Sequence, residues 1–296
     1  MRELSGVFPA TLTPFTTETG PVDEAWLAEH LRYLEQQGVH GVLPLGTTGE
    51  GQALSLSERQ RVIDGVLEHR GTLAVIVGTG CASLPETIAL SRYAIERGVD
   101  AILVAPPFFF KGVPDTGLLA YYRAVCSALP DDARVLLYHI PQVTMVSITP
   151  AVVEGLLESH PQQVFGIKDS SGDAATFATF TQYQGLRLYG GNEAIADNAM
   201  KLGAYGLISA FANLLPGLVR AVYDAHITGG DTSTAQARLN ALVKLIPGNT
   251  PPALKAAMPW ITGLPRTSVR VPLANLPDAE AATLRAGLDA LMQANA

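Results

Sequence analysis

Cysteines, long hydrophobic runs and leader-like segments are all scarce or missing in this sequence. Its 296 residues include only two cysteines, Cys81 and Cys126, which are too few for a disulfide framework and suit the reducing cytosol. No stretch reaches the roughly 18 consecutive apolar residues of a membrane span, and we find no signal peptide after Arg2 and Glu3. We therefore expect a cytoplasmic protein with no membrane partner.

Basic residues are also few. Lysine and arginine number 20 against 27 aspartates and glutamates, so the formal net charge is −7, and the pI is about 5.4. Nucleic acid is not expected as a partner, because binding to phosphates needs a basic face. The six histidines form no cluster at metal-ligand spacing, so no metal is expected. Hydrophobic residues, by contrast, make up 48% of the chain, which is enough for a large globular core.

Short apolar runs alternate with amphipathic helical patterns over most of the chain. Strands are predicted at 6–12, 41–44, 73–77, 101–104, 135–138, 164–167, 186–189 and 206–208, and helices between them at 23–37, 57–69, 84–97, 116–128 and 149–159. Strands that are apolar throughout and separated by helices indicate a parallel sheet covered on both faces. Eight such units predict the α/β class and a closed (β/α)₈ TIM barrel. A doubly wound open sheet is the alternative, but the first turn after a strand, at 11–15, has no glycine.

No further strand is evident after about residue 214. Helical patterns are predicted there at 214–227, 233–245, 253–263 and 279–294. We therefore expect a barrel domain over residues 1–213 and a C-terminal helical region over 214–296.

The sixth apolar run leads directly into a lysine. Lys168 follows the run 164–167, and the preceding strand ends on Tyr138. A desolvated lysine is shifted toward its neutral, nucleophilic form, and a nearby phenol can pass protons to and from it. This pair indicates a Schiff-base enzyme. The alternative is a solvated lysine at a strand end that pairs with its neighbour Asp169.

Unusual residues gather at the carboxyl ends of the predicted strands, where a barrel carries its chemistry. After the second strand comes Gly46-Thr47-Thr48-Gly49, whose free N–H groups and two hydroxyls suit a carboxylate or a phosphate. The turn lacks the Gly-Lys-Ser/Thr ending of a nucleotide-binding P-loop, so a triphosphate is not expected. The alternative is a purely structural turn capped by threonine.

Three motifs together resemble those of the dihydrodipicolinate synthase and N-acetylneuraminate lyase superfamily. They are Gly46-Thr47-Thr48-Gly49-Glu50, Tyr138-x-x-Pro141 and Gly166-Ile167-Lys168-Asp169. The resemblance continues through 203–209 to the segment 269–273. It implies a TIM barrel with a C-terminal helical region, a homotetramer built as a dimer of dimers, and class I pyruvate chemistry without metal or organic cofactor.

The resemblance also implies roles for individual residues. Lys168 would form the imine with the keto carbon of pyruvate or another 2-keto acid, and Tyr138 would be the general acid and base. Thr47 and Thr48 match the pair that binds the pyruvyl carboxylate, and Thr47 would also orient Tyr138. The positions that would bind the rest of the substrate are Ser170, Gly191, Asn192, Glu193, Ile208 and Ser209.

The chain departs from dihydrodipicolinate synthases at two places. Those enzymes have Pro-Tyr-Tyr after the fourth strand, where the second tyrosine completes a proton relay across the dimer interface, and this chain has Phe108 and Phe109. They also carry an arginine five residues after the tyrosine of the fifth strand, and this chain has Val143. Both departures speak against lysine biosynthesis. His139, where the family often has asparagine, is expected to be a core histidine bonded to the backbone.

We therefore expect an aldolase or lyase that cleaves a 2-keto-3-deoxy sugar acid, or a related 4-hydroxy-2-keto acid, to pyruvate and an aldehyde. The polar residues Ser170, Asn192, Glu193 and Ser209 would meet a hydroxylated chain, or Asn192 and Glu193 only cap the following helix. A sugar-acid dehydratase, a 4-hydroxy-tetrahydrodipicolinate synthase and a non-catalytic keto-acid sensor are the alternatives. A sensor would need neither Lys168 nor Tyr138.

Overall fold

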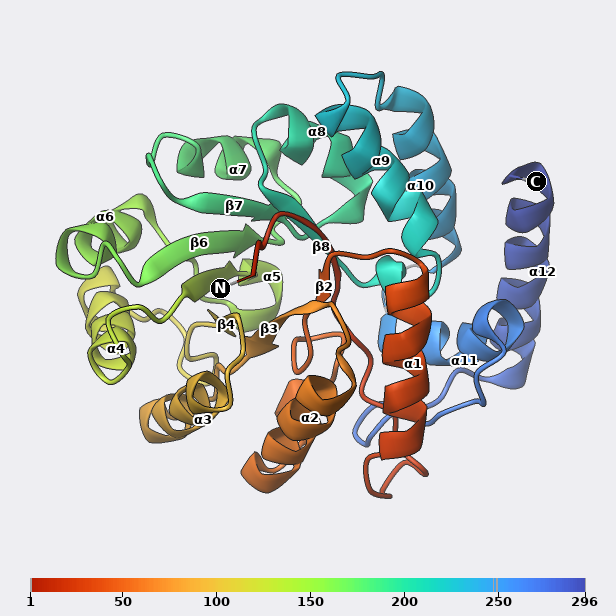
Figure 1. The fold of residues 1–296 in the computed structure, drawn as a ribbon, viewed down its shortest axis with the longest axis horizontal. Coiled ribbons are helices and arrows are strands. Elements are labelled where there is room, and N and C mark those ends of the chain that lie inside the picture. The colour runs from red at the N-terminus through yellow and green to blue at the C-terminus, as the bar shows by residue number, and fades with distance from the viewer. Residues whose placement is uncertain (1, 247, 249, 296) are drawn as a thin grey trace.

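Eight parallel strands form the centre of the computed structural model, which describes residues 2–246, 248 and 250–295 (Figure 1). The strands are Gly6–Pro9 (β1), Gly41–Val42 (β2), Ala74–Gly78 (β3), Ala101–Val104 (β4), Val135–His139 (β5), Val164–Asp169 (β6), Arg187–Gly190 (β7) and Gly206–Ser209 (β8). From β2 to β8 each strand pairs with the next one in sequence, and β8 pairs with β1. Backbone hydrogen bonds from His40 N to Val7 O (3.1 Å) and from Leu43 N to Pro9 O (2.8 Å) connect the segment of β2 to β1. The ring is thereby closed, and the predicted TIM barrel is confirmed.

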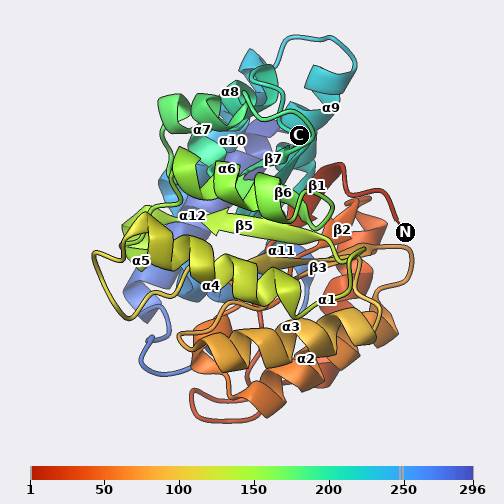
Figure 2. The same ribbon diagram turned by 90° about the vertical axis from the view of Figure 1, so that its left-hand side faces the viewer.

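Helices cover the outside of the barrel. The helices of the first eight units are Glu24–Gln36 (α1), Leu56–His69 (α2), Leu84–Glu96 (α3), Asp115–Ser127 (α4), Pro141–Thr144 (α5), Pro150–Ser159 (α6), Ala174–Phe180 (α7), Ala196–Lys201 (α8) and Pro216–Ile227 (α9). Short 3₁₀ turns lie at Gly51–Ala53, Glu193–Ile195 and Phe211–Asn213. Helices α2, α3, α4 and α6 pack side by side around one side of the barrel (Figure 2). The short helices α5, α7 and α8 were not among those predicted from the sequence.

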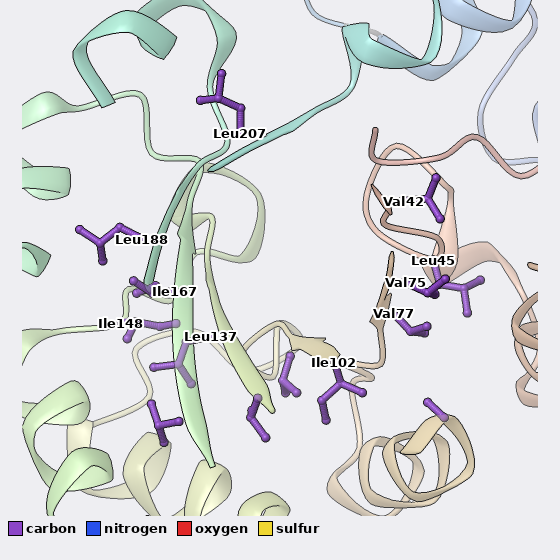
Figure 3. Packing of buried hydrophobic residues seen from close by; sticks show 14 of the residues in the cluster. Val42, Leu45, Val75, Val77, Ile102, Leu137, Ile148, Ile167, Leu188 and Leu207 are labelled. Carbon is purple, nitrogen blue, oxygen red and sulfur yellow. The ribbon is translucent and has the colours of Figure 1, made fainter. Parts of the chain in front are cut away.

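Most strand residues are apolar because both faces of the strands are buried. Successive residues point to opposite faces of a strand, so Val75 and Ile102 pack outward against the helices, as Figure 3 shows. Their neighbours Ile76 and Leu103 fill the barrel interior. In β6 the same alternation puts Ile167 in the outer layer, and it therefore turns Lys168 toward the interior.

Strand β6 extends two residues beyond the predicted 164–167. Its register pairs Lys168 with Tyr138 and Asp169 with His139 on β5. The extension depends on backbone hydrogen bonds: Ser170 N donates to His139 O (2.9 Å), and Gly191 N donates to Asp169 O (2.8 Å). Hydrophobicity marks the buried part of a strand, whereas these bonds decide where it ends.

The C-terminal helices build a second layer beside the barrel. They are Ser233–Leu245 (α10), Thr250–Thr262 (α11) and Asp278–Asn295 (α12), and Figure 1 shows α12 at the outer edge of the molecule. Helix α9 packs against β1 and β8, and α10 packs against α9 and α12. The predicted boundary between residues 213 and 214 stays a prediction. Among the described helices, none is both long and apolar enough to span a bilayer.

Candidate active site

Lys168 and Tyr138 lie together inside the carboxyl end of the barrel. Because β5 and β6 are neighbours in register, the Lys168 Nζ comes within 3.4 Å of the Tyr138 Oη. It also lies 4.5 Å from the centre of the tyrosine ring, a contact in which the ring face attracts an ammonium group. Both side chains are 5% exposed. The structure thus brings together the two residues that the sequence predicts to react.

Asp169 does not serve as a counterion for this lysine. It points to the other face of β6, where its Oδ1 accepts a hydrogen bond from Ser171 N (2.8 Å). Among the described residues, no ion pair involves Lys168. The solvated, Asp169-paired lysine considered from the sequence is therefore not what the structure shows.

His139 occupies the outer face of β5, beside Asp169. Its Nδ1 accepts a hydrogen bond from Ile148 N (3.1 Å), and its ring packs edge-on against Phe180, with 5.6 Å between the ring centres. Burial lowers the pKa of His139 and raises the pKa of Asp169, since both charged forms lose hydration there. This agrees with the expected core histidine bonded to the backbone.

The threonine turn after β2 reaches the same point from across the barrel. The Thr47 Oγ1 lies 3.4 Å from the Tyr138 Oη, so a chain of contacts runs from threonine through tyrosine to Lys168. The turn is closed by hydrogen bonds from Glu50 N to Thr47 O (3.1 Å) and from Gly51 N to Gly46 O (3.2 Å). Thr48 is buried within it. The hydroxyls and backbone groups of the turn can hold a carboxylate beside the amine.

A buried ion pair fixes this turn to the C-terminal region, and the sequence analysis missed it. Glu50 has a left-handed backbone conformation (φ 52°), and its carboxylate accepts hydrogen bonds from Lys255 Nζ on α11 and from Arg270 N (2.8 Å). The Lys255 and Glu50 side chains are each only 1% exposed. Burial lowers the pKa of Lys255 to about 8. The signal in the sequence was a single charged residue within the otherwise uncharged helix Thr250–Thr262.

The polar residues that follow β7 and β8 are bonded to one another. The Glu193 Oε1 accepts hydrogen bonds from Ser209 Oγ (2.7 Å) and from Ala210 N (2.7 Å). The Asn192 Oδ1 accepts one from Ala194 N (3.0 Å), so Asn192 caps the 3₁₀ turn that follows it. The roles of Asn192, Glu193 and Ser209 in binding substrate stay predictions, and each side chain already has a structural contact.

Ser170 and Gly191 border the reactive lysine. A Cβ atom on Gly191 would lie 2.2 Å from Ser170 Oγ and 2.8 Å from Lys168 Cε, so the position has no room for a side chain. The Ser170 hydroxyl is buried, and in the described structure it has no hydrogen-bond partner. A buried hydroxyl without a partner costs free energy, which a substrate oxygen bound here would offset. Ile208, the remaining predicted residue, is buried in the barrel interior.

A cavity of about 460 Å³ opens beside the reactive pair. Its lining includes Thr47 and Tyr138, residues in or after β3, β4 and β5, and Pro272 and Leu273. The volume falls in the range of small-molecule sites, roughly 300–1,000 Å³. Asn192, Glu193 and Ser209 are not part of this lining; with the core residues Ala196, Leu207 and Val219 they border a small void that has no room for a water molecule. No group of three or more potential metal ligands occurs among the described residues.

Comparison with known families gives one match, which covers nearly the whole chain. Residues 3–291 match the model of the dihydrodipicolinate synthetase family. An uncharacterized DapA-like lyase of Chloroflexus aurantiacus is 53% identical over 99% of this chain and 98% of its own length. The 4-hydroxy-tetrahydrodipicolinate synthase of Methanopyrus kandleri is 34% identical over 77% of this chain and 75% of its own.

Solved structures share the fold over the same extent. The sialic acid aldolase of Ruminococcus gnavus superimposes with a TM-score of 0.92 at 25% identity, covering 99% of both chains. YagE from E. coli K12, a protein of the dihydrodipicolinic acid synthase family in complex with pyruvate, gives 0.91 at 27% identity, covering 98% of this chain and 99% of its own.

Proposed function

Because the chain belongs to the dihydrodipicolinate synthetase family, we propose that it is a Schiff-base lyase that cleaves a 4-hydroxy-2-keto acid to pyruvate and an aldehyde. The observation that supports this most is the buried amine of Lys168, 3.4 Å from the Tyr138 phenol. A nucleophile within reach of an acid/base group, which a third group orients, is the arrangement that covalent catalysis requires. Thr47 is that third group, 3.4 Å from the phenol.

The proposed reaction begins when the neutral Lys168 amine attacks the keto carbon. Tyr138 gives its phenolic proton to the hydroxyl group of the tetrahedral adduct, which leaves as water, and the protonated imine that forms draws electrons from C3. The Tyr138 phenolate then accepts the proton of the C4 hydroxyl while the C3–C4 bond breaks, and the aldehyde departs. The electron pair of that bond forms an enamine, Tyr138 returns the proton to C3, and water then hydrolyses the imine to release pyruvate and the free amine. Throughout, Thr47 and Thr48 hold the carboxylate, so that the keto carbon faces the amine.

The tail beyond C4 distinguishes the possible substrates. The sequence favours a 2-keto-3-deoxy sugar acid, whose hydroxyls would meet Ser170, Asn192, Glu193 and Ser209. The R. gnavus structural neighbour is named as a sialic acid aldolase, which supports this possibility. A dehydratase would use the same imine on a similar acid but would break a C–O bond and release no pyruvate.

The second candidate is condensation of pyruvate with aspartate semialdehyde, because several relatives are named 4-hydroxy-tetrahydrodipicolinate synthase. That aldehyde carries its own carboxylate, and burying a charge without a partner costs several kcal/mol. Val143 supplies no charge at the position implied for an arginine. Lys111 is the cation nearest to it in the cavity lining, and its ammonium already donates to Phe108 O and to Thr144 O (3.1 Å).

The proposal is tested by measuring pyruvate release from a panel of 4-hydroxy-2-keto acids. Condensation of pyruvate with aspartate semialdehyde is measured on the same enzyme preparation. We expect cleavage of at least one acid at a higher kcat/KM than the condensation, and no cleavage by Lys168→Ala. Efficient condensation without cleavage of any acid would favour the synthase instead. Loss of the substrate without pyruvate would indicate a dehydratase.

We also infer that the protein is a cytoplasmic homotetramer, built as a dimer of dimers. The family resemblance supports the assembly, and so do two large apolar side chains at the barrel mouth, Phe109 (72% exposed) and Phe110 (69% exposed). Exposed apolar groups of this size tend to lie in contacts between proteins. Light scattering coupled to size exclusion should give four times the chain mass, and a monomer mass would contradict the inference.

A further inference from the structure

The cavity next to Thr47 and Tyr138 does not include the polar residues Asn192, Glu193 and Ser209 in its lining. This separation bears on the kind of tail that the substrate carries. We propose, on the basis of the lyase function above, that the substrate tail is an apolar alkyl or aryl group. The tail occupies the cavity next to Thr47 and Tyr138 and leaves with the aldehyde.

The cavity is lined mainly by hydrocarbon. Its apolar lining includes Leu103, Ala105, Phe108, Ile140, Val143 and Leu273. These residues come from strand β4, from the segments after β4 and β5, and from the C-terminal segment. An apolar group that enters this space loses its contact with water, and nearly all the surface it meets is also apolar.

The polar side chains in the same lining already have partners. The Gln52 Nε2 donates to Gly80 O (2.8 Å), and its Oε1 accepts from Arg59 (3.3 Å). The Thr144 Oγ1 donates to Ile140 O (3.1 Å), and Glu50 is paired with Lys255. A hydroxylated tail would therefore lose hydrogen bonds to water and find few in return, which is unfavourable for polar groups.

The polar residues on the opposite side of the mouth are not part of this cavity lining. Glu193 Oε1 is already used by Ser209 Oγ and Ala210 N. A hydroxyl of a sugar tail would therefore have to bind at the other carboxylate oxygen, or displace these donors. The cavity next to Tyr138 needs no such change, and its volume of about 460 Å³ is already open.

The cavity is also in the right place for the bond that breaks. Tyr138 is part of its lining and lies 3.4 Å from the Lys168 amine. In the proposed mechanism this phenol contacts the C4 hydroxyl of an acid bound to Lys168 as the imine. The substituent on C4 is then next to the cavity that Tyr138 lines.

The test compares two acids that share the reacting atoms and differ in the tail. One is 4-hydroxy-2-oxo-4-phenylbutanoate, and the other is 2-keto-3-deoxygluconate. We expect kcat/KM for the phenyl acid to be at least about 10-fold higher, since even small changes of fit in an apolar pocket produce effects of this size. Faster cleavage of the sugar acid would overturn the inference and leave the lyase function standing. Failure to release pyruvate from either acid would overturn the lyase function, and the inference with it.

A pair of variants tests the location. Val143 lines the cavity, whereas Met145, two residues later, is not part of that lining. Both residues are exposed, Val143 by 55% and Met145 by 65%. Val143→Arg should lower kcat/KM for the phenyl acid about 10-fold, because a charge then enters the apolar space. Met145→Arg adds the same charge nearby and should change it less than about 2-fold. Equal losses in the two variants, at unchanged melting temperatures, would contradict the proposed location.

Discussion

The two sides of the barrel mouth both carry polar residues, but the contacts that these residues make differ. We call the group Lys168, Tyr138 and Thr47 the reactive side, and the group Asn192, Glu193 and Ser209 the packed side. On the reactive side the polar groups lie 3.4 Å apart beside an open cavity. On the packed side Glu193 holds its partners at 2.7 Å.

The difference shows that a polar residue after a barrel strand is not by itself a binding group. A donor or acceptor site already used within the protein is open to a ligand only when that bond breaks, and a buried partner left unpaired costs about 1–3 kcal/mol. Long contacts beside an open space can shorten when a substrate arrives. Chemistry is therefore expected on the reactive side and structural support on the packed side.

Removing the phenol of the reactive side should have the largest effect. Tyr138→Phe should lower kcat for pyruvate release by roughly 10²–10⁴-fold, the contribution of a general acid/base group. Tyr189→Phe is the matched control, because that buried phenol is not part of the cavity lining and donates to Leu4 O (2.9 Å). Steady-state kinetics of both variants decide the point. Similar kcat values for the two would remove Tyr138 from the proposed mechanism.

The ion pair between Lys255 on α11 and Glu50 holds the threonine turn of the reactive side, and breaking it should lower the stability of the protein. Lys255→Met leaves Glu50 buried without its counterion, so the free energy of unfolding should fall by about 3–5 kcal/mol. The double variant Lys255→Met/Glu50→Gln should recover part of this loss, because no unpaired charge is then buried. Urea denaturation measures all three proteins.

The control for this pair is Arg70→Met, which breaks the Arg70–Asp100 bridge of 3.0 Å, whose side chains are more exposed than Lys255 and Glu50. Its loss should be smaller, since a partly exposed pair contributes less. If Lys255→Met were no more destabilising than Arg70→Met, the ion pair would not be what holds the threonine turn.

The smallest effect on catalysis is expected from the packed side. Glu193→Ala removes the acceptor of Ser209 and Ala210, so the free energy of unfolding should fall by about 1–3 kcal/mol. We expect kcat/KM for the preferred acid to change less than about 10-fold. Thermal melts and kinetics on the phenyl and sugar acids separate the two roles. An increase in KM confined to the sugar acid, with stability intact, would make Glu193 a substrate-binding residue.

Local sequence patterns were enough to predict the barrel and the reactive pair. The run 101–104 is apolar and bounded by turns, and it coincides with β4. Tyr138 and Lys168 could be placed together because each lies at the carboxyl end of an apolar run and the two runs are consecutive strands of a parallel sheet. Helices α7 and α8 have seven and six residues, which is too short for a clear helical period.

The remaining features depend on partners that are distant in sequence. Glu50 and Lys255 are 205 positions apart, and no local pattern links them. The sequence shows that Glu193 carries a carboxylate. It does not show that this carboxylate accepts hydrogen bonds from the Ser209 hydroxyl and the Ala210 N–H. The cavity forms where residues in or after four strands lie next to Pro272 and Leu273. This arrangement is evident only in the folded chain.

The most direct test of the account is to identify the lysine that forms the imine. The protein is treated with pyruvate and borohydride, digested and analysed by peptide mass spectrometry. Lys255 is an internal control, because it is also buried but is paired with Glu50. The account predicts a reduced pyruvyl adduct on Lys168, none on Lys255, and no adduct in Lys168→Ala. An unmodified Lys168, together with full activity of Lys168→Ala, would contradict the Schiff-base mechanism.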